Sequence, residues 1–159
     1  MKYLNSSKKN LFRFEYLQNF EEEENFMKHW RETGLIDKKS MQDWWNFIKQ
    51  KNSKGIKTSR VRRVVFPLTE YTRMELEVHK MTMKFGDKIR IIMDDAYKEL
   101  KIQAKDFWIV DDNIVLEMKY DCNGKYLGFE KKDNWQDYLK IEDELHENSI
   151  PLEQFLNQN

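Results

Sequence analysis

Residues 55–86 read GIKTSRVRRVVFPLTEYTRMELEVHKMTMKFG, and the hydrophobic period of the chain changes within them. The segment 56–66 is apolar on both sides in its second half, which indicates a buried strand in the interior of a sheet. After Pro67, apolar side chains recur at helical spacing from Tyr71 to Met81, although an alternation at 74–78 leaves a second strand as the alternative. A strand that passes into a helix therefore stands at the centre of the predicted fold.

Upstream of this segment, two helices are predicted. One covers 20–33, where a glutamate run at 21–24 suits the positive end of the helix dipole, and the other begins with a capping-box pattern at Ser40 and ends at Gly55. Residues 11–17 alternate and contain aromatic side chains, so they form either a short extended arm or a first helical turn. Residues 1–10 are polar, and we expect a flexible N-terminus there.

Downstream, a strand at 88–93 and an antiparallel meander over 106–131 are predicted. Asn123-Gly124 lies between alternating segments, which is a strong hairpin signal because both central residues of a type I′ turn take positive φ. A second two-residue turn at Asp112-Asn113 would set Ile109 opposite Leu116. Together the two turns predict one common apolar face made of Phe107, Ile109, Leu116, Met118, Tyr120, Leu127 and Phe129.

A closing helix from Trp135 to about Pro151 completes the order of elements. We therefore predict an α+β fold, with a largely antiparallel sheet, a C-terminal three-stranded meander and about four helices. Residues 11–159 are expected to form a single domain, because 159 residues with 40% hydrophobic content suffice for one sizeable core.

The composition also bounds the cellular setting. The single Cys122 excludes an internal disulfide, so nothing indicates an oxidising compartment. The N-terminus lacks the apolar core of a signal peptide, and no later run has the length of a membrane span. We expect a cytoplasmic protein without a membrane partner.

Charge is balanced overall but unevenly placed. Residues 51–93 hold 11 basic and 4 acidic side chains, whereas residues 94–159 hold 8 and 16. Either these segments neutralise one another in the fold, or a basic face is available to phosphates or to an acidic partner. Zero net charge is unlike a dedicated nucleic-acid binder, whose domain is usually strongly basic.

Several blocks of the chain, in this order, resemble a family of small bacterial proteins of unknown function. The blocks are 11–17 (LFRFEYL), 60–75 (RVRRVVFPLTEYTRME), 86–90 (GDKIR), 106–112 (DFWIVDD) and 118–128 (MKYDCNGKYLG). That family is abundant in actinobacteria, and its genes often lie beside helix-turn-helix regulators of the WhiJ type. The resemblance implies a regulatory or interaction role linked to a DNA-binding partner, and a mobile genetic element as a natural home.

A weaker likeness connects residues 105–112 (KDFWIVDD) to half of the phospholipase D fold, in which a hydrophobic strand ends in acidic residues. The histidine that this chemistry requires is missing, because His29, His79 and His146 do not have its spacing. This likeness implies a non-catalytic relative of that fold.

No local motif predicts a reaction, so no catalytic residue, metal or cofactor is expected. Arg73, Glu75 and Asp111 could form a small pocket, or they could serve only an internal ion pair and a hairpin turn. The basic run 54–63 could line a phosphate-binding edge, or it could be an ordinary solvated strand. The candidate binding residues are Arg60, Arg62, Arg63, Tyr71, Arg73, Glu75, Asp106, Trp108, Asp111 and Asp112.

Three functions follow from these observations. The first is a non-enzymatic regulatory or adaptor protein that binds another protein, with a helix-turn-helix regulator as the expected partner. The second is a nucleic-acid-binding module that uses the basic strand 54–63. The third is a hydrolase-like protein with a pocket at Arg73, Glu75 and Asp111.

Overall fold

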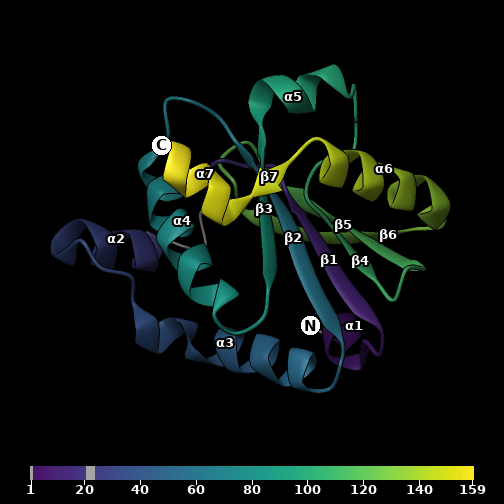
Figure 1. The fold of residues 1–159 in the computed structure, drawn as a ribbon, viewed down its shortest axis with the longest axis horizontal. Coiled ribbons are helices and arrows are strands. Elements are labelled where there is room, and N and C mark those ends of the chain that lie inside the picture. The colour runs from purple at the N-terminus through teal and green to yellow at the C-terminus, as the bar shows by residue number, and fades with distance from the viewer. Residues whose placement is uncertain (1, 21–23) are drawn as a thin grey trace.

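The computed structural model describes residues 2–20 and 24–159, so most of the glutamate run predicted to start a helix lies outside the described residues. The described chain forms a seven-stranded mixed sheet in the order β6-β5-β4-β1-β2-β3-β7, with helices on both faces (Figure 1). The strands are β1 (Asn10–Glu15), β2 (Lys57–Val64), β3 (Lys88–Met93), β4 (Phe107–Val110), β5 (Ile114–Tyr120), β6 (Tyr126–Lys132) and β7 (Ile150–Pro151). The helices are α1 (Lys2–Ser6), α2 (Glu24–Thr33), α3 (Lys38–Ser53), α4 (Glu70–Met83), α5 (Asp94–Glu99), α6 (Trp135–Glu147) and α7 (Leu152–Gln158).

The predicted passage from a strand into a helix is confirmed by β2 and α4. Thr69 caps α4, because its side-chain oxygen accepts a hydrogen bond from the backbone N–H of Thr72. The alternative of a strand at 74–78 is therefore wrong. At α3, the helix begins earlier than predicted, since Asp37 rather than Ser40 is the N-cap and accepts from the N–H groups of residues 39 and 40.

The sheet is mixed rather than largely antiparallel. β1, β2 and β3 run parallel to one another, and α2, α3 and α4 form the crossover connections between them. β4, β5 and β6 form the predicted antiparallel meander, which joins the parallel half through the β1–β4 pair. The prediction of about four helices omitted the short ones, of which α1, α5 and α7 have 5, 6 and 7 residues. Among the described residues, none of the helices has the length and hydrophobicity of a membrane span.

The register of the meander differs from the prediction by one residue. Ile109 lies opposite Val115, not Leu116, because Asp111 and Asp112 both take positive φ and lengthen the turn. Met118 lies opposite Phe129 as predicted, but a bulge then pairs Tyr120 with residue 126. The predicted common apolar face is therefore wrong: the β4 members 107 and 109 point to the opposite face from Met118 and Tyr120.

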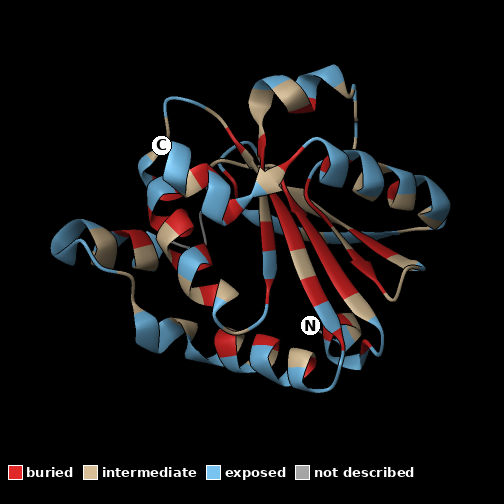
Figure 2. Cartoon of the chain, viewed as in Figure 1, coloured by how far each residue is buried: buried red, intermediate tan, exposed pale blue. Residues whose placement is uncertain are grey.

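The two faces of the sheet differ in chemistry. The face toward α5 and α6 is an apolar core that includes Phe12, Phe14 and Phe107, packed by Tyr97 and Tyr138 from these helices. Arg13 and Glu15 alternate with Phe12 and Phe14 along β1, so their side chains point to the other face of the sheet. α3 and α4 cover that face (Figure 1). Both faces are covered, which is why burial runs continuously along the central strands (Figure 2).

Candidate functional site

Ionisable side chains cover the middle of the sheet on the α3 and α4 side. Arg13 and Glu15 of β1 lie in register beside Arg60 and Arg62 of β2, so the four side chains share one face. α4 contributes Glu75 and His79 to the same group of side chains. The segments that precede β3 and β4 contribute one aspartate each. All are buried, and we call them the charged cluster: Arg13, Glu15, Arg60, Arg62, Glu75, His79, Asp87 and Asp106.

Four ion pairs organise the three arginines of the cluster. Arg60 pairs through Nη1 with Glu15, and its Nε donates to Asp87 Oδ2 at 2.9 Å. Arg13 Nη2 lies 3.3 Å from Asp106 Oδ1. Arg62 Nη2 lies 2.8 Å from Glu75 Oε2. Each arginine therefore has a carboxylate partner inside the fold.

His79 lies between two of these carboxylates. Its Nε2 is 3.2 Å from Glu15 Oε2 and 3.9 Å from Glu75 Oε1. Glu75 and His79 are four residues apart on α4, which places both on the face of the helix that meets β1. The backbone thus aims one histidine and two glutamates at a common point.

Burial and charge act in opposite directions on the acids of the cluster. Burial alone would raise the pKa of Glu15, but the guanidinium of Arg60, together with His79 and Arg62, outweighs it and holds that pKa well below its usual range. Burial raises the pKa of Asp106, and the nearby Arg13 offsets only part of the shift. The folded environment therefore favours the carboxylate form of Glu15.

Arg62 is the most unusual member. Its side chain is 0% exposed, and its Nε and Nη1 have no hydrogen-bond partner among the described residues. Its guanidinium carbon lies 5.9 Å from the ring centroids of both Phe20 and Tyr71. A buried charge with unmade hydrogen bonds reduces stability, so its presence indicates a role other than holding the fold together.

Two cavities open onto the charged cluster from different sides. One, of about 320 Å³, lies between α3, α4 and the sheet, and its walls include Trp44, Arg60 and His79. The other, of about 330 Å³, is bounded by aromatic side chains that include Phe20 and Tyr120. Glu15 and Glu75 line both cavities.

The structure brings six of the ten predicted binding residues together in and around the charged cluster. Trp108 lies under the guanidinium of Arg13, whose carbon is 5.5 Å from the ring centroid. Tyr71 donates from its hydroxyl to Glu75 Oε1 at 3.2 Å. The six residues are Arg60, Arg62, Tyr71, Glu75, Asp106 and Trp108.

The expected phosphate-binding edge is wrong in its geometry. Arg60 and Arg62 point into the fold and are buried. Arg63 points to the opposite face, where its Nε donates to Asp94 Oδ1 at 2.8 Å and its guanidinium lies 4.1 Å from the centroid of Tyr16. These three arginines do not form an exposed basic strip, so only Lys54 and Lys57 of the basic run remain exposed for the nucleic-acid hypothesis.

The pocket predicted from Arg73, Glu75 and Asp111 is not assembled. Arg73 is exposed on α4. The carboxylate of Asp111 accepts hydrogen bonds from the backbone N–H groups of residues 8, 9 and 10, at the start of β1, whereas Glu75 lies near its end at Glu15. The five steps between residues 10 and 15 correspond to about 16 Å of strand. Asp112 pairs with Lys9, also at the start of β1.

Sequence reasoning missed Arg13, Glu15, His79 and Asp87. The alternation of Arg13 and Glu15 with Phe12 and Phe14 was visible, but such alternation is typical of a strand with one solvated face. A signal for Arg13 and Glu15 was present in the sequence, because charged residues alternate with apolar ones at 60 and 62 as they do at 13 and 15. When two such strands pair side by side, their charged side chains lie on the same face.

A second notable surface lies on β6. Large apolar side chains are exposed at its start: Tyr126 is 38%, Leu127 63% and Phe129 48% exposed. The bulge that follows Lys119 on β5 leaves Leu127 without an opposite residue in the ladder. We call Tyr126, Leu127 and Phe129 the apolar platform. It adjoins the second cavity, which Tyr126 also lines.

Buried pairing neutralises two arginines of the basic middle segment. Arg60 and Arg62 pair with Glu15, Glu75 and Asp87, none of which belongs to the acidic segment 94–159. The acidic residues of α6 are therefore left largely uncompensated by this cluster, and the exposed ones are Asp137, Asp143, Glu144 and Glu147.

Comparison with known protein families gives one result that covers almost the entire chain. Residues 1–157 match the family described as a domain of unknown function, DUF6879. This bears out the resemblance to a family of unknown function, and the family brings no assigned activity. The comparison with curated proteins found no match.

Proposed function

The chain belongs to the DUF6879 family of domains of unknown function, and we propose that it is a regulatory or adaptor protein that binds another protein through the apolar platform on β6. The observation that carries the proposal is the exposure of Tyr126, Leu127 and Phe129 on a strand at the edge of the sheet. Contiguous exposed apolar side chains on a soluble fold mark sites of protein interaction.

The two edge strands of the sheet, β6 and β7, differ in how much backbone they offer to another chain. β7 has two residues, ends in Pro151 and is followed directly by α7, so it offers almost no edge to another chain. β6 has seven residues, and its first half carries apolar side chains where protected edges carry charges. Its charged residues, 130 to 132, lie only in the second half. One edge is thus closed and the other is available.

Charge indicates the kind of partner. α6 follows β6 after two residues and exposes four acidic side chains, against one exposed lysine, Lys140. The acidic surface of the helix that follows β6 suits a partner with a basic, partly apolar surface that reaches around this edge of the sheet. A helix-turn-helix regulator, the partner implied by the family resemblance, has this character because DNA-binding proteins are basic.

The test is affinity capture of the tagged chain from its host, with and without nuclease, followed by identification of what remains bound. Leu127→Asp with Phe129→Asp removes the platform, and Leu35→Asp is the matched control because Leu35 is 66% exposed in the loop between α2 and α3. Loss of a central anchor typically costs about 2 kcal/mol or more of binding free energy, or roughly 30-fold in affinity.

We expect a DNA-binding regulator to be captured at near-equal molar amounts after nuclease, to be lost with the platform variant and to be retained by the control. Retention by both variants would show that the partner binds elsewhere and would refute the platform. Capture of nucleic acid alone, released by moderate salt, would refute the adaptor function.

A further inference from the structure

We propose that Glu15, Glu75 and His79 form a binding site for a divalent transition-metal ion of the Zn²⁺ class. The site lies inside the charged cluster and is separate from the apolar platform. All three side chains are more than nine-tenths buried. Each offers one ligand atom, and the three atoms lie within 4.8 Å of one another.

The distances suit a single ion. Protein ligands bind Zn²⁺ at about 2.0–2.2 Å, which places neighbouring ligand atoms roughly 3.0–3.6 Å apart in tetrahedral or octahedral geometry. His79 Nε2 and Glu15 Oε2 are already 3.2 Å apart. His79 Nε2 and Glu75 Oε1 are 3.9 Å apart, so a small rotation of the Glu75 side chain completes the set.

The ligands come from rigid elements. Glu75 and His79 project from one face of α4, a helix of 14 residues with a capped N-terminus. Glu15 projects from β1, which is hydrogen-bonded to a strand on each side. A site built on a helix and a central strand keeps its geometry better than one built on loops.

Each glutamate divides its two oxygens between an arginine and the histidine. Glu15 pairs with Arg60 through Oε1 and turns Oε2 toward His79. Glu75 pairs with Arg62 through Oε2, and its Oε1 lies toward His79 while it also accepts the hydrogen bond from the Tyr71 hydroxyl. The arginines therefore do not have to leave for an ion to bind, and they act as the outer partners that orient ligating carboxylates.

The charge balance accommodates a dication. Apart from His79, the cluster contains three arginines and four carboxylates, a net charge of −1 when all seven are ionised. One divalent ion changes this to +1, and both values are small for a site with eight ionisable groups. Asp87 and Asp106 hold Arg60 and Arg13, which leaves the Glu15 and Glu75 oxygens near His79 for the ion.

The surroundings provide access and an open position. The cavity of about 320 Å³ is lined by all three ligands together with Ser40 and Trp44. Three protein ligands leave a fourth position for water or a small ligand, which is the arrangement of reactive rather than structural zinc sites.

The ligand types select the metal. An imidazole with two carboxylates suits Zn²⁺, Co²⁺ or Fe²⁺, whereas Mg²⁺ and Ca²⁺ prefer oxygen ligands throughout. We therefore expect Zn²⁺ and Co²⁺ to bind in the presence of excess Mg²⁺.

The primary test leaves the charged cluster intact. The chain has three histidines, so the double variant His29→Gln, His146→Gln retains His79 as the single imidazole. Its ¹⁵N imidazole resonances are followed by NMR while Zn²⁺ is added to metal-free protein. We expect a saturable shift of the ring nitrogens at about one ion per chain. An imidazole spectrum unchanged by Zn²⁺ would overturn the proposal.

A second measurement uses Co²⁺, whose visible absorption reports its ligands. Unmodified protein should give a saturable spectrum at about one ion per chain, and His79→Gln should bind more than about 100-fold more weakly, because loss of a ligand exceeds the usual effect of an outer partner. His146→Gln is the matched control and should behave as the unmodified protein. Equal Co²⁺ binding by His79→Gln and the control would overturn the site; if His79→Gln does not fold, the NMR titration decides.

Discussion

The buried pair of Arg62 and Glu75 gives the sharpest test of how the charged cluster affects stability. Arg62→Met removes the guanidinium while keeping an unbranched apolar side chain of similar length, so Glu75 loses its arginine in a site that is 7% exposed. The nearest atoms of the pair are 2.8 Å apart. With charge centres about 4 Å apart and an effective dielectric constant of about 20, their attraction is about 4 kcal/mol.

We therefore expect Arg62→Met to lower the free energy of unfolding by about 3–5 kcal/mol, the usual result of removing one partner of a buried pair. Glu75→Met should have a similar effect, because it leaves the arginine buried without that carboxylate. The double variant should lie near the unmodified protein or be more stable, since apolar replacement of both partners also removes the unmade donors of Arg62.

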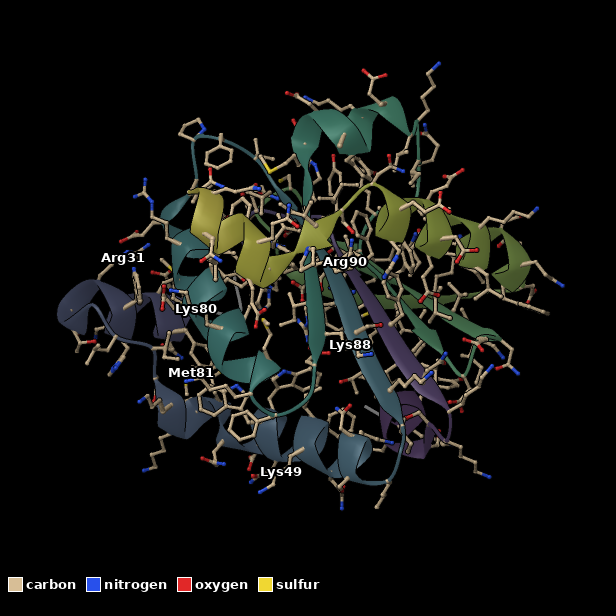
Figure 3. All side chains as sticks on the ribbon, viewed as in Figure 1. Arg31, Lys49, Lys80, Met81, Lys88 and Arg90 are labelled. Carbon is tan, nitrogen blue, oxygen red and sulfur yellow. The ribbon has the colours of Figure 1, made fainter. Side chains whose placement is uncertain are left out.

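The assay is urea unfolding of the unmodified protein, both single variants and the double variant at neutral pH, with the coupling energy taken from the cycle. Arg31→Met is the control, because Arg31 of α2 (Figure 3) pairs with Glu24 and Glu70 at the surface and should contribute less than about 1 kcal/mol. A loss below about 1 kcal/mol in Arg62→Met, or a double variant as unstable as the sum of the singles, would refute this account of the pair.

Three further predictions concern other parts of the fold. Burial raises the pKa of Glu142 to about 7, above its unfolded value, so the ionised carboxylate destabilises the fold. Urea unfolding should therefore show that Glu142→Gln adds about 1–3 kcal/mol of stability at pH 8 and almost none at pH 4. A Cβ at Gly124 would lie 2.6 Å from the carbonyl oxygen of Asn19, whereas Gly34 has open space, so thermal unfolding should show a larger loss for Gly124→Ala than for Gly34→Ala although both have positive φ. Lys51→Met removes an ammonium that donates to the carbonyls of residues 5 and 7, and hydrogen exchange should accelerate at residues 2–9 while β2 stays protected.

Local sequence signals were sufficient for the elements that depend on local chemistry. The passage from β2 into α4 was recognisable because Thr69 is a good cap and the apolar period changes behind it. The hairpin at Asn123-Gly124 was found as well, but its turn is not the predicted type I′, because Gly124 takes positive φ and Asn123 does not. The loop is longer than two residues, since Tyr120 pairs with Tyr126. The turn before it was misjudged by one residue because it covers three residues rather than two, with Asp111 and Asp112 both in the left-handed conformation.

The charged cluster could not be predicted as a unit because its partners are far apart in sequence. Arg13 and Asp106 are separated by 93 residues, and Glu15 and Arg60 by 45. Glu75 and Arg62 were singled out, but no local pattern says that one faces the other across a helix and a strand. The parallel pairing of β1 with β2 carries that information, and the prediction of a largely antiparallel sheet concealed it.

The central position of β1 has a consequence for how the chain is made. β1 is the first strand to be synthesised, yet its neighbours are β2 and β4, which include residues 57–64 and 107–110. At 5–20 residues per second, the ribosome needs roughly 5–20 s to pass from Arg13 to Asp106. During that interval the nascent strand presents Phe12 and Phe14 with at least one open edge, so chaperones that hold nascent chains should bind this segment more than any later strand.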